Sequence, residues 1–355
     1  MQPGRDKDNN FDFLRLAAAT GVLLSHQFAL SGRPEPLFIN SSWGGLGVLV
    51  FFAISGYLIA GSWVRDPHLW RFAVRRFLRI WPGLAVATVL VVFVLGPLVS
   101  SLGSTEYFSS PVTWTYLNLL GLWEFESQLP GIFAGNPVPQ SANGSLWTIP
   151  IEVKCYALLA LVGVLGFMRR SGLLLVAAFA ASAVWFFFLL KMGYDNPLRM
   201  KLQMGVVFFS GSCLCVLRSH WLPHRRWFAL LSALTIAALW FGGWQEVAMT
   251  LGLPLATVVF GSCATPLLRR AGRFGDISYG LYIYAFPVQQ TIIWVTGNRL
   301  SVLEGACFTV PVTVALAFLS WHLVERPALL WKDRLGAGAP HRASASAVVG
   351  RPVDR

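Results

Sequence analysis

The sequence predicts an all-α fold: a polytopic membrane helical bundle of about ten transmembrane helices with both termini in the cytoplasm. Of its 355 residues, 55% are hydrophobic and only 12% are charged, whereas roughly a quarter of the residues of an ordinary soluble domain are charged. This composition excludes a soluble globular protein. The lengths of the apolar runs and the distribution of Lys and Arg between the loops predict the bundle and its orientation.

Ten apolar runs approach the length that a transmembrane helix requires, which is about 20 residues. Because an unpaired backbone cannot lie in lipid, each run is expected to form a helix. The runs cover residues 11–30, 44–63, 80–100, 146–168, 172–190, 202–217, 227–242, 247–268, 277–297 and 304–325.

The charge distribution supports the same topology. The chain has 28 Lys and Arg residues against 16 Asp and Glu residues, which gives a formal net charge of +12. With the N-terminus inside, most of the positive residues fall in cytoplasmic loops, as expected of a membrane protein. The exceptions are Arg33, Lys191, Arg199, Lys201 and Arg299 in outer loops, and Arg15 and Lys154 inside spans. We therefore expect a multi-pass protein of the cell inner (plasma) membrane, with the lipid bilayer and not nucleic acid as its partner.

The chain is predicted to contain one membrane domain, residues 1–335, and a disordered cytoplasmic tail, residues 336–355, rich in Ala, Gly, Ser and Arg. The longest loop, 101–144, lies outside and carries many apolar residues, so we expect it to pack over the outer mouth of the bundle. An amphipathic interfacial segment is the alternative. Its residues Trp114, Tyr116 and Trp123 are candidates for stacking on a ligand ring.

No metal site is expected, because the five cysteines lie in predicted spans without a metal-binding spacing. The glycines at 44, 45 and 47 resemble a nucleotide-binding loop, but no strand precedes them and no lysine follows. Close helix packing explains them better.

Two polar residues share one face of the first predicted span. Arg15 and His26 are eleven residues apart, which places them ~16 Å apart along a helix axis. Arg15 then lies at the cytoplasmic boundary and His26 well inside the membrane, where polar residues mark functional sites. The alternative is that His26 has no catalytic role and is a core residue whose ring is satisfied by hydrogen bonds.

Four arginines precede the third span: Arg71, Arg75, Arg76 and Arg79. Arg76 and Arg79, three residues apart, offer planar donors for phosphate oxygens. Arg71 and Arg75 are interpreted as positive-inside anchors. Together, four arginines near one opening favour a polyanionic ligand such as an adenosine-phosphate-pantetheine carrier.

Glu152 lies where the outer loop enters the fourth span. A buried carboxylate there could orient or protonate His26, or position an acceptor hydroxyl. The alternative is a packing carboxylate paired with an arginine. Ser278, Tyr279 and Tyr282 are further candidates that could hydrogen-bond a ligand, although interfacial anchoring explains the tyrosines as well.

In their order along the chain, these motifs resemble membrane acyltransferase family 3, from about Phe11 to Arg334. The residues that carry the resemblance are Arg15 and His26 with ten residues between them, Gly47 to Ile59, Arg76 and Arg79 before Pro82, Ser145-Leu146-Trp147 with Glu152 and Tyr156, Ser278-Tyr279-Gly280-Leu281-Tyr282, and Glu325-Arg326-Pro327. Members of this family O-acylate bacterial surface glycans, Nod factors and some antibiotics. Two positions depart from the common pattern: Leu49 replaces an acidic residue and Ala285 replaces a histidine.

The resemblance implies transfer of an acyl group, with acetyl favoured, from cytoplasmic acyl-coenzyme A to a hydroxyl of a glycan or lipid-linked glycan. Acyl-coenzyme A is then a co-substrate, and no bound cofactor is expected. By matching position, the catalytic residues are His26, Arg15 and Glu152, and the donor-binding residues are Arg76 and Arg79. The acceptor or pocket residues are Ser145, Trp147, Ser278, Tyr279 and Tyr282. Of these, Ser278, Tyr279 and Tyr282 could hydrogen-bond a sugar hydroxyl or the pantetheine arm. With a glycan acceptor, the loop residues Trp114, Tyr116 and Trp123 could stack on sugar rings.

Acyl transfer requires a base for the hydroxyl proton and donors for the oxyanion. His26 is the candidate that titrates near neutrality, either as the base or as a transient carrier of the acyl group. The competing class is a multi-span transporter that uses Arg15, His26 and Glu152 as a relay. Such proteins often contain internal repeats, and none is seen between the two halves of this sequence.

Overall fold

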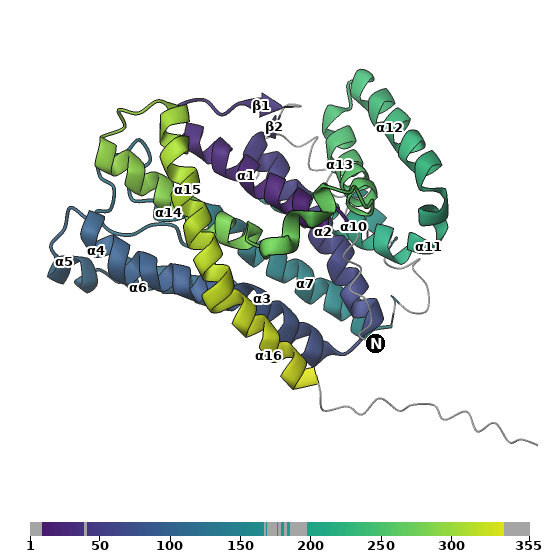
Figure 1. The fold of residues 1–355 in the computed structure, drawn as a ribbon, viewed down its shortest axis with the longest axis horizontal. Helices are drawn as coiled ribbons and strands as arrows, with labels where there is room; N and C mark the ends of the chain where they lie inside the picture. The colour runs from purple at the N-terminus through teal and green to yellow at the C-terminus, as the bar shows by residue number, and fades with distance from the viewer. Residues whose placement is uncertain are drawn as a thin grey trace, which may run out of the picture.

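The computed structural model describes residues 9–38, 41–166 and 197–336, together with positions 168, 176, 179, 180, 183 and 184. The described part is built from helices that are joined mostly by short connections (Figure 1). The prediction of an all-α membrane protein is confirmed.

The first two long helices form the centre of the bundle. Helix α1 spans Phe11–Leu30. Two short antiparallel strands of two residues each, β1 (Leu37–Phe38) and β2 (Ser41–Ser42), connect it to α2, Trp43–Arg65. Helix α2 packs against α1 and against α10, Pro197–Val216, and α13, Gln245–Gly261.

Glycines allow α2 to approach its neighbours closely. A side chain at Gly47 would lie 2.7 Å from the carbonyl oxygen of Ala18 on α1, and one at Gly56 would collide with the Phe208 backbone on α10. Small residues at such contacts are typical of membrane helix packing. The interpretation of Gly47 as a packing residue is therefore confirmed.

The third helical segment runs from residue 69 to residue 99. It consists of α3 (Leu69–Leu90), the π-helix η1 (Val91–Leu95) and α4 (Gly96–Val99). The outer loop that follows contains α5 (Ser104–Ser109), α6 (Pro111–Thr115) and η2 (Tyr116–Gly121), and it returns through η3 (Gly144–Thr148) into α7 (Ile149–Val164).

The outer loop is packed, as predicted, because Tyr107, Leu129 and Phe133 form a buried cluster with the end of the third helical segment. The expectation for Tyr116 is wrong: its side chain is fully buried in this cluster and cannot stack on a sugar. Trp114 and Trp123 are about half exposed.

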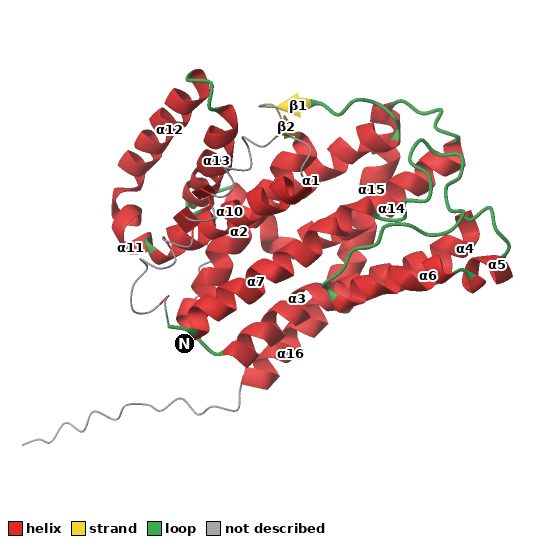
Figure 2. Cartoon of the chain, turned by 180° about the vertical axis from the view of Figure 1, so that it is seen from behind, coloured by secondary structure: helices red, strands yellow, loops and turns green. Residues whose placement is uncertain are grey.

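The second half of the described chain contains a helical hairpin at the edge of the bundle, formed by α12 (Arg225–Phe241) and α13, and a pair of helices, α14 (Ser278–Thr296) and α15 (Val302–Ser320), that pack against each other (Figure 2). The hairpin follows the short α11 (Arg218–Trp221) and η4 (Leu222–His224). The pair α14 and α15 follows η5, Leu268–Phe274. Helix α15 continues through the π-helix η6 (Trp321–Glu325) into α16, Arg326–Gly336, which packs against α3.

Of the described helices, five are long and apolar enough to cross a membrane, or up to six if the bent pair Leu198–Val216 and Arg218–Phe241 counts as one span. The count of ten spans and the orientation of the termini stay predictions. Most of the predicted span 172–190, and all of the predicted tail after Gly336, lie outside the described residues.

Candidate active site

Seven of the predicted site residues lie around one cavity inside the bundle. The cavity has a volume of about 130 Å³ and lies between α1, α2, α3, α7 and α14. Its predicted lining residues are Arg15, Arg76, Arg79, Glu152, Ser278, Tyr279 and Tyr282. The fold therefore brings together side chains from five segments that are far apart in the sequence. We call this space the inner cavity.

A second, wider space adjoins the inner cavity. It has a volume of about 1140 Å³ and shares Arg15, Leu58, Arg76 and Arg79 with the inner cavity. Its other basic lining residues are Arg75, Arg269, Arg270, Arg273, His322 and Arg326, and its acidic ones are Asp12 and Asp276. We call this space the arginine cleft.

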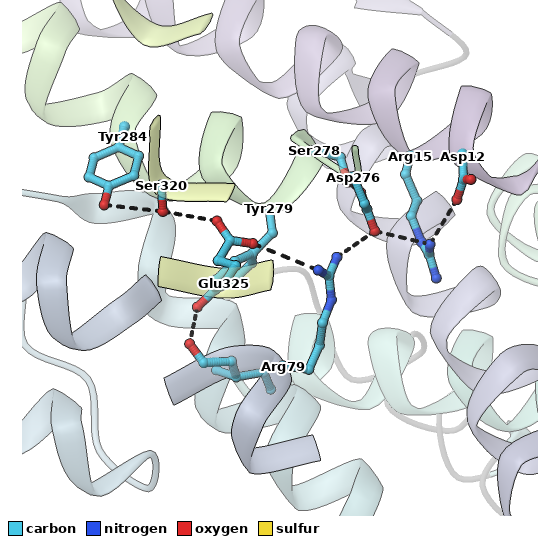
Figure 3. A network of polar contacts seen from close by, with 10 residues as sticks. Asp12, Arg15, Arg79, Asp276, Ser278, Tyr279, Tyr284, Ser320 and Glu325 are labelled. Atoms are coloured by element: carbon cyan, nitrogen blue, oxygen red, sulfur yellow. Dashed lines mark hydrogen bonds and ion pairs between the residues drawn. The ribbon is translucent and has the colours of Figure 1, made fainter. Parts of the chain in front are cut away.

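Asp276, in the turn before α14, joins two of the predicted site arginines (Figure 3). Its Oδ2 atom lies 2.6 Å from Nη2 of Arg79 and 3.3 Å from Nη1 of Arg15, and its Oδ1 atom accepts a 2.5 Å hydrogen bond from the Ser278 hydroxyl. Arg15 also pairs with Asp12 at 3.2 Å. Burial raises the pKa of Asp276, but Arg79, Arg15 and Ser278 lower it by more, to about 2. Asp276 therefore remains ionised at neutral pH.

A buried carboxylate holds Arg79 from the other side. The π-helix η6 turns Glu325 into the bundle, where it is 1% exposed and its Oε2 atom lies 3.7 Å from Nη1 of Arg79. The Ser320 hydroxyl donates to the other carboxylate oxygen at 2.9 Å. The Arg79 guanidinium also faces the rings of Tyr279 and Trp321, at 5.7 and 6.0 Å from their centroids. Arg79 is thus fixed in place and largely neutralised.

Arg76 differs from Arg79 although both line the two spaces. The buried Nε atom of Arg76 has no hydrogen-bond partner among the described residues, and its guanidinium forms no ion pair with any of them. Electrostatic attraction to Tyr156 and, to a smaller extent, to Glu152 partly offsets its burial. Arg71 and Arg75 both pair with Asp66, at 2.5 and 2.7 Å, in keeping with an anchoring role. Arg76 is therefore the guanidinium best placed to meet an anion at the junction of the two spaces.

Glu152 forms a small polar cluster on the wall of the inner cavity. Its Oε1 atom accepts a 2.7 Å hydrogen bond from the Ser55 hydroxyl and another from the Tyr156 hydroxyl, and Ser55 and Tyr156 lie 3.0 Å apart. No direct contact joins Glu152 to His26. Lys154, two residues further on, instead faces the ring of Trp123 at 5.3 Å.

His26 lies beside the inner cavity but is not one of its lining residues. Its Nδ1 atom is 3.2 Å from the Ser145 hydroxyl, and the ring meets Phe286 edge-on at 5.5 Å. The Tyr282 hydroxyl donates to the Ser145 carbonyl and lies 2.6 Å from the Thr148 hydroxyl, and both Tyr282 and Thr148 line the cavity. Ser145 and Tyr282 therefore separate His26 from the cavity by a single layer of side chains.

An acidic residue, Glu35, lies near His26 at the C-terminal end of α1. The Ser25 hydroxyl donates a hydrogen bond to Glu35, and the Glu35 carboxylate acts electrostatically on the His26 ring. Glu35 belongs to the segment that connects α1 to β1.

Trp147 is partly buried against the main core and lines neither space. The two departures from the family pattern, Leu49 and Ala285, are 4% and 3% exposed, so both positions are filled by apolar packing. Among the described residues, no group of three or more His, Cys, Asp or Glu side chains could hold a metal ion.

Sequence reasoning missed several residues of the site. Asp276 stands just before the motif that begins at Ser278, and Glu325 belongs to the Glu325-Arg326-Pro327 motif, but neither residue gives a local signal of its ion pair with Arg79. Ser55 lies within an apolar run, and nothing in the sequence around it indicates its contacts with Glu152 and Tyr156. Arg269, Arg270 and Arg273 had been counted only as cytoplasmic loop charges.

The chain was compared with known families and proteins. A family model described as an acyltransferase domain matches residues 8–322. An O-acetyl transferase of Shigella phage Sf6 is 33% identical, over 90% of this chain and 96% of that protein. Nodulation protein 10 of Rhizobium leguminosarum bv. viciae is 32% identical, over 93% of this chain and 95% of its own length.

A third relative is longer than this chain. The peptidoglycan O-acetyltransferase OatA of Listeria monocytogenes is 26% identical over 90% of this chain and 55% of its own length. No solved structure matches the chain. The family match covers most of the described residues and includes the inner cavity and most of the arginine cleft. The chain therefore belongs to membrane acyltransferase family 3 and is an enzyme that transfers acyl groups other than aminoacyl groups.

Proposed function

We propose that this protein is a membrane O-acyltransferase that moves an acetyl group from acetyl-coenzyme A to a hydroxyl of a glycan or lipid-linked glycan. The observation that carries the proposal is the connection of three parts: the arginine cleft, the inner cavity with Arg76 at its opening, and His26 one side-chain layer beyond. The names of two relatives, an O-acetyl transferase and a peptidoglycan O-acetyltransferase, support the reaction class.

The size of the inner cavity supports a small acyl group. A space of about 130 Å³ is close to that of an engineered cavity of about 150 Å³ that accepts benzene. An acetyl group with the end of a pantetheine arm suits such a space, whereas a long fatty chain does not. The donor then enters from the arginine cleft, on the side predicted to be cytoplasmic.

The reaction joins the acceptor oxygen to the acyl carbon. The hydroxyl oxygen attacks the thioester carbonyl carbon, and its proton passes across the layer formed by Ser145 and Tyr282 to His26. The carbon–sulfur bond breaks, and the coenzyme A sulfur leaves as a thiolate, which takes up a proton as His26 gives one up, so that the base is restored. A base near the hydroxyl typically contributes a factor of roughly 100 to 10,000 in rate. The unpaired guanidinium of Arg76 supports donor binding at the opening of the cavity.

Ser145 is proposed to orient the histidine. When its hydroxyl accepts a hydrogen bond from Nδ1–H of His26, across the 3.2 Å between the two atoms, Nε2 keeps its lone pair and can accept the hydroxyl proton. Tyr282 fixes the Ser145 backbone from the cavity side. Ser145 and Tyr282 thus position the base relative to the acyl group.

The acceptor is proposed to approach from the outer side of the plasma membrane. His26 and the neighbouring Glu35 lie toward that side of α1, and the packed outer loop flanks them through Ser145. Trp114 and Trp123, which are about half exposed on that loop, are available to contact a sugar.

The proposal is tested with membranes that contain the protein, labelled acetyl-coenzyme A and a glycan acceptor. We expect release of free coenzyme A together with incorporation of label into the acceptor, and loss of both in His26→Ala. His224→Ala, which changes an exposed histidine far from the cavity, is the matched control and should keep full activity. Movement of unmodified label across the membrane, without release of coenzyme A, would support the transporter alternative instead.

A further inference from the structure

The charge of the arginine cleft is not explained by membrane topology alone. Eight arginines line the cleft together with two carboxylates, Asp12 and Asp276, and two further carboxylates outside the lining, Asp66 and Glu325, pair with Arg75 and Arg79. The positive-inside rule places arginines on the cytoplasmic side of a membrane protein, but it does not make them converge on one hollow. Like charges that converge repel one another, and an anion bound between them would reduce this repulsion.

The arginines outside the motifs come mainly from one short segment. The 3-10 helix η5 supplies Arg269, Arg270 and Arg273, and it packs against α1. A side chain at Gly272 would lie very close to the carboxylate of Asp12 on α1, so the backbone of η5 lies close to that helix. Gly275 has a φ of +117° and lies against the Trp321 indole. The backbone that carries the three arginines is therefore held against α1 and η6.

The arginine cleft and the inner cavity differ in size and in the chemistry of their lining residues. The cavity is small and lined by aromatic, aliphatic and hydroxyl groups besides its charges, whereas the cleft is several times larger and rich in guanidinium groups. Planar guanidinium groups bind phosphate oxygens with two parallel hydrogen bonds. A donor that carries its acyl group on a neutral arm and its negative charge at the far end matches this division.

We propose that Arg269, Arg270 and Arg273 of η5, with Arg326 of α16, bind the phosphate groups at the nucleotide end of the acyl donor. This inference rests on the proposed function and assigns the donor a direction: phosphates in the arginine cleft, pantetheine past Arg76, and thioester in the inner cavity. The η5 arginines then select a donor that carries phosphates over one that carries the pantetheine arm alone.

The test compares three donors on the same enzyme: acetyl-coenzyme A, its 3′-dephospho form, and acetyl-pantetheine, which has no phosphate. For wild type we expect kcat/KM to fall along this series. In Arg270→Ala we expect the preference for acetyl-coenzyme A over acetyl-pantetheine to shrink about tenfold, which is the effect of losing one contact of about 1.4 kcal/mol. Arg270→Lys should keep part of the preference, because it retains the charge without the planar pair of donors.

Arg218→Ala is the matched control, because this arginine is exposed on α11 and lines neither space. It should leave the ratio of the two donors unchanged. An equal loss of kcat/KM for all three donors in Arg270→Ala and Arg269→Ala would overturn the inference. If wild type uses none of the three donors, the proposed function fails instead.

A second arm distinguishes the donor from an anionic lipid, since a lipid headgroup offers the same phosphate chemistry. The three donors are measured with the enzyme in neutral phosphatidylcholine vesicles and again in vesicles that contain phosphatidylglycerol. The inference predicts the same change of donor preference in both. A change that occurs only with phosphatidylglycerol would overturn it and assign the η5 arginines to the lipid surface.

Discussion

The carboxylate of Asp276 lies 2.6 Å from the guanidinium of Arg79, although the two residues are 197 positions apart in the sequence. The same carboxylate oxygen reaches Arg15, so one acidic residue links the first helix, the third helix and the turn before α14. Without Asp276, Arg79 keeps only Glu325 and Arg15 keeps only Asp12 as acidic partners, and the loss of one partner from a largely buried ion pair is destabilising.

Asp276→Asn should therefore destabilise the protein by about 3 kcal/mol and release both arginines from their fixed positions. We expect a lower melting temperature in detergent and a loss of acyl transfer. Glu106→Gln, in the exposed part of the outer loop, serves as the control and should change neither. Unchanged melting of Asp276→Asn would mean that this ion pair does not hold the site together.

The contribution of Asp276 should depend on pH in the acid range. Its pKa in the folded protein is about 2, below its ordinary value of about 4. A carboxyl group with a lowered pKa adds stability that is complete above about pH 4 and is lost as the pH falls toward about 2. The shift corresponds to about 2 kcal/mol. The difference in melting temperature between wild type and Asp276→Asn should stay constant above about pH 5 and shrink below about pH 4.

Arg76 and Arg79 should respond differently to substitution, despite their equivalent positions in the motif. Arg79 has two carboxylate partners and two aromatic neighbours, so Arg79→Ala should lower both activity and melting temperature. Arg76 has no ion-pair partner among the described residues, so Arg76→Ala should raise the KM for the acyl donor roughly tenfold with little loss of stability. Donor-concentration series and thermal unfolding of both variants separate the two effects. Similar melting temperatures for both variants would contradict this division.

A double-mutant cycle tests the pairing directly. Because Arg79 and Asp276 are in contact, their combined substitution should cost less than the sum of the two single changes, with a coupling of about 1 to 3 kcal/mol. The same cycle for Arg76 and Asp276 should give a coupling near zero. Additive effects for Arg79 and Asp276 would show that the contact contributes little.

Ser145 should act through His26. Ser145→Ala is expected to lower kcat roughly tenfold, the effect of one lost hydrogen bond of about 1.5 kcal/mol, while the KM for the acyl donor stays the same. Ser145→Thr retains the hydroxyl and should restore much of the rate. Loss of the same size in both variants would indicate a packing effect at this position and not a hydrogen bond to the histidine.

Direct transfer and transient acylation of His26 give different results in a single turnover. The enzyme is mixed with labelled acetyl-coenzyme A without acceptor, quenched and examined for protein-bound label. If His26 acts as the base, no adduct forms at this residue. Label that is bound in wild type and absent in His26→Ala would instead establish the covalent route.

The sequence by itself determined the class of protein and the positions of most helices. The predicted run 11–30 coincides with α1, and 44–63 lies within α2, because the length of an apolar run and the need to pair its backbone are local properties. The pattern of motifs likewise determined the family, which the match over residues 8–322 confirmed.

Only the tertiary structure decided which charges meet. The sequence places Arg76 and Arg79 as equals, but packing brings Asp276 and Glu325 to Arg79 and not to Arg76. It also places Glu152 with Ser55 and Tyr156, and His26 with Ser145, where the sequence left a contact between Glu152 and His26 open. Ion pairs and hydrogen bonds act over a few ångströms, so their partners depend on how distant helices pack and not on spacing along one helix.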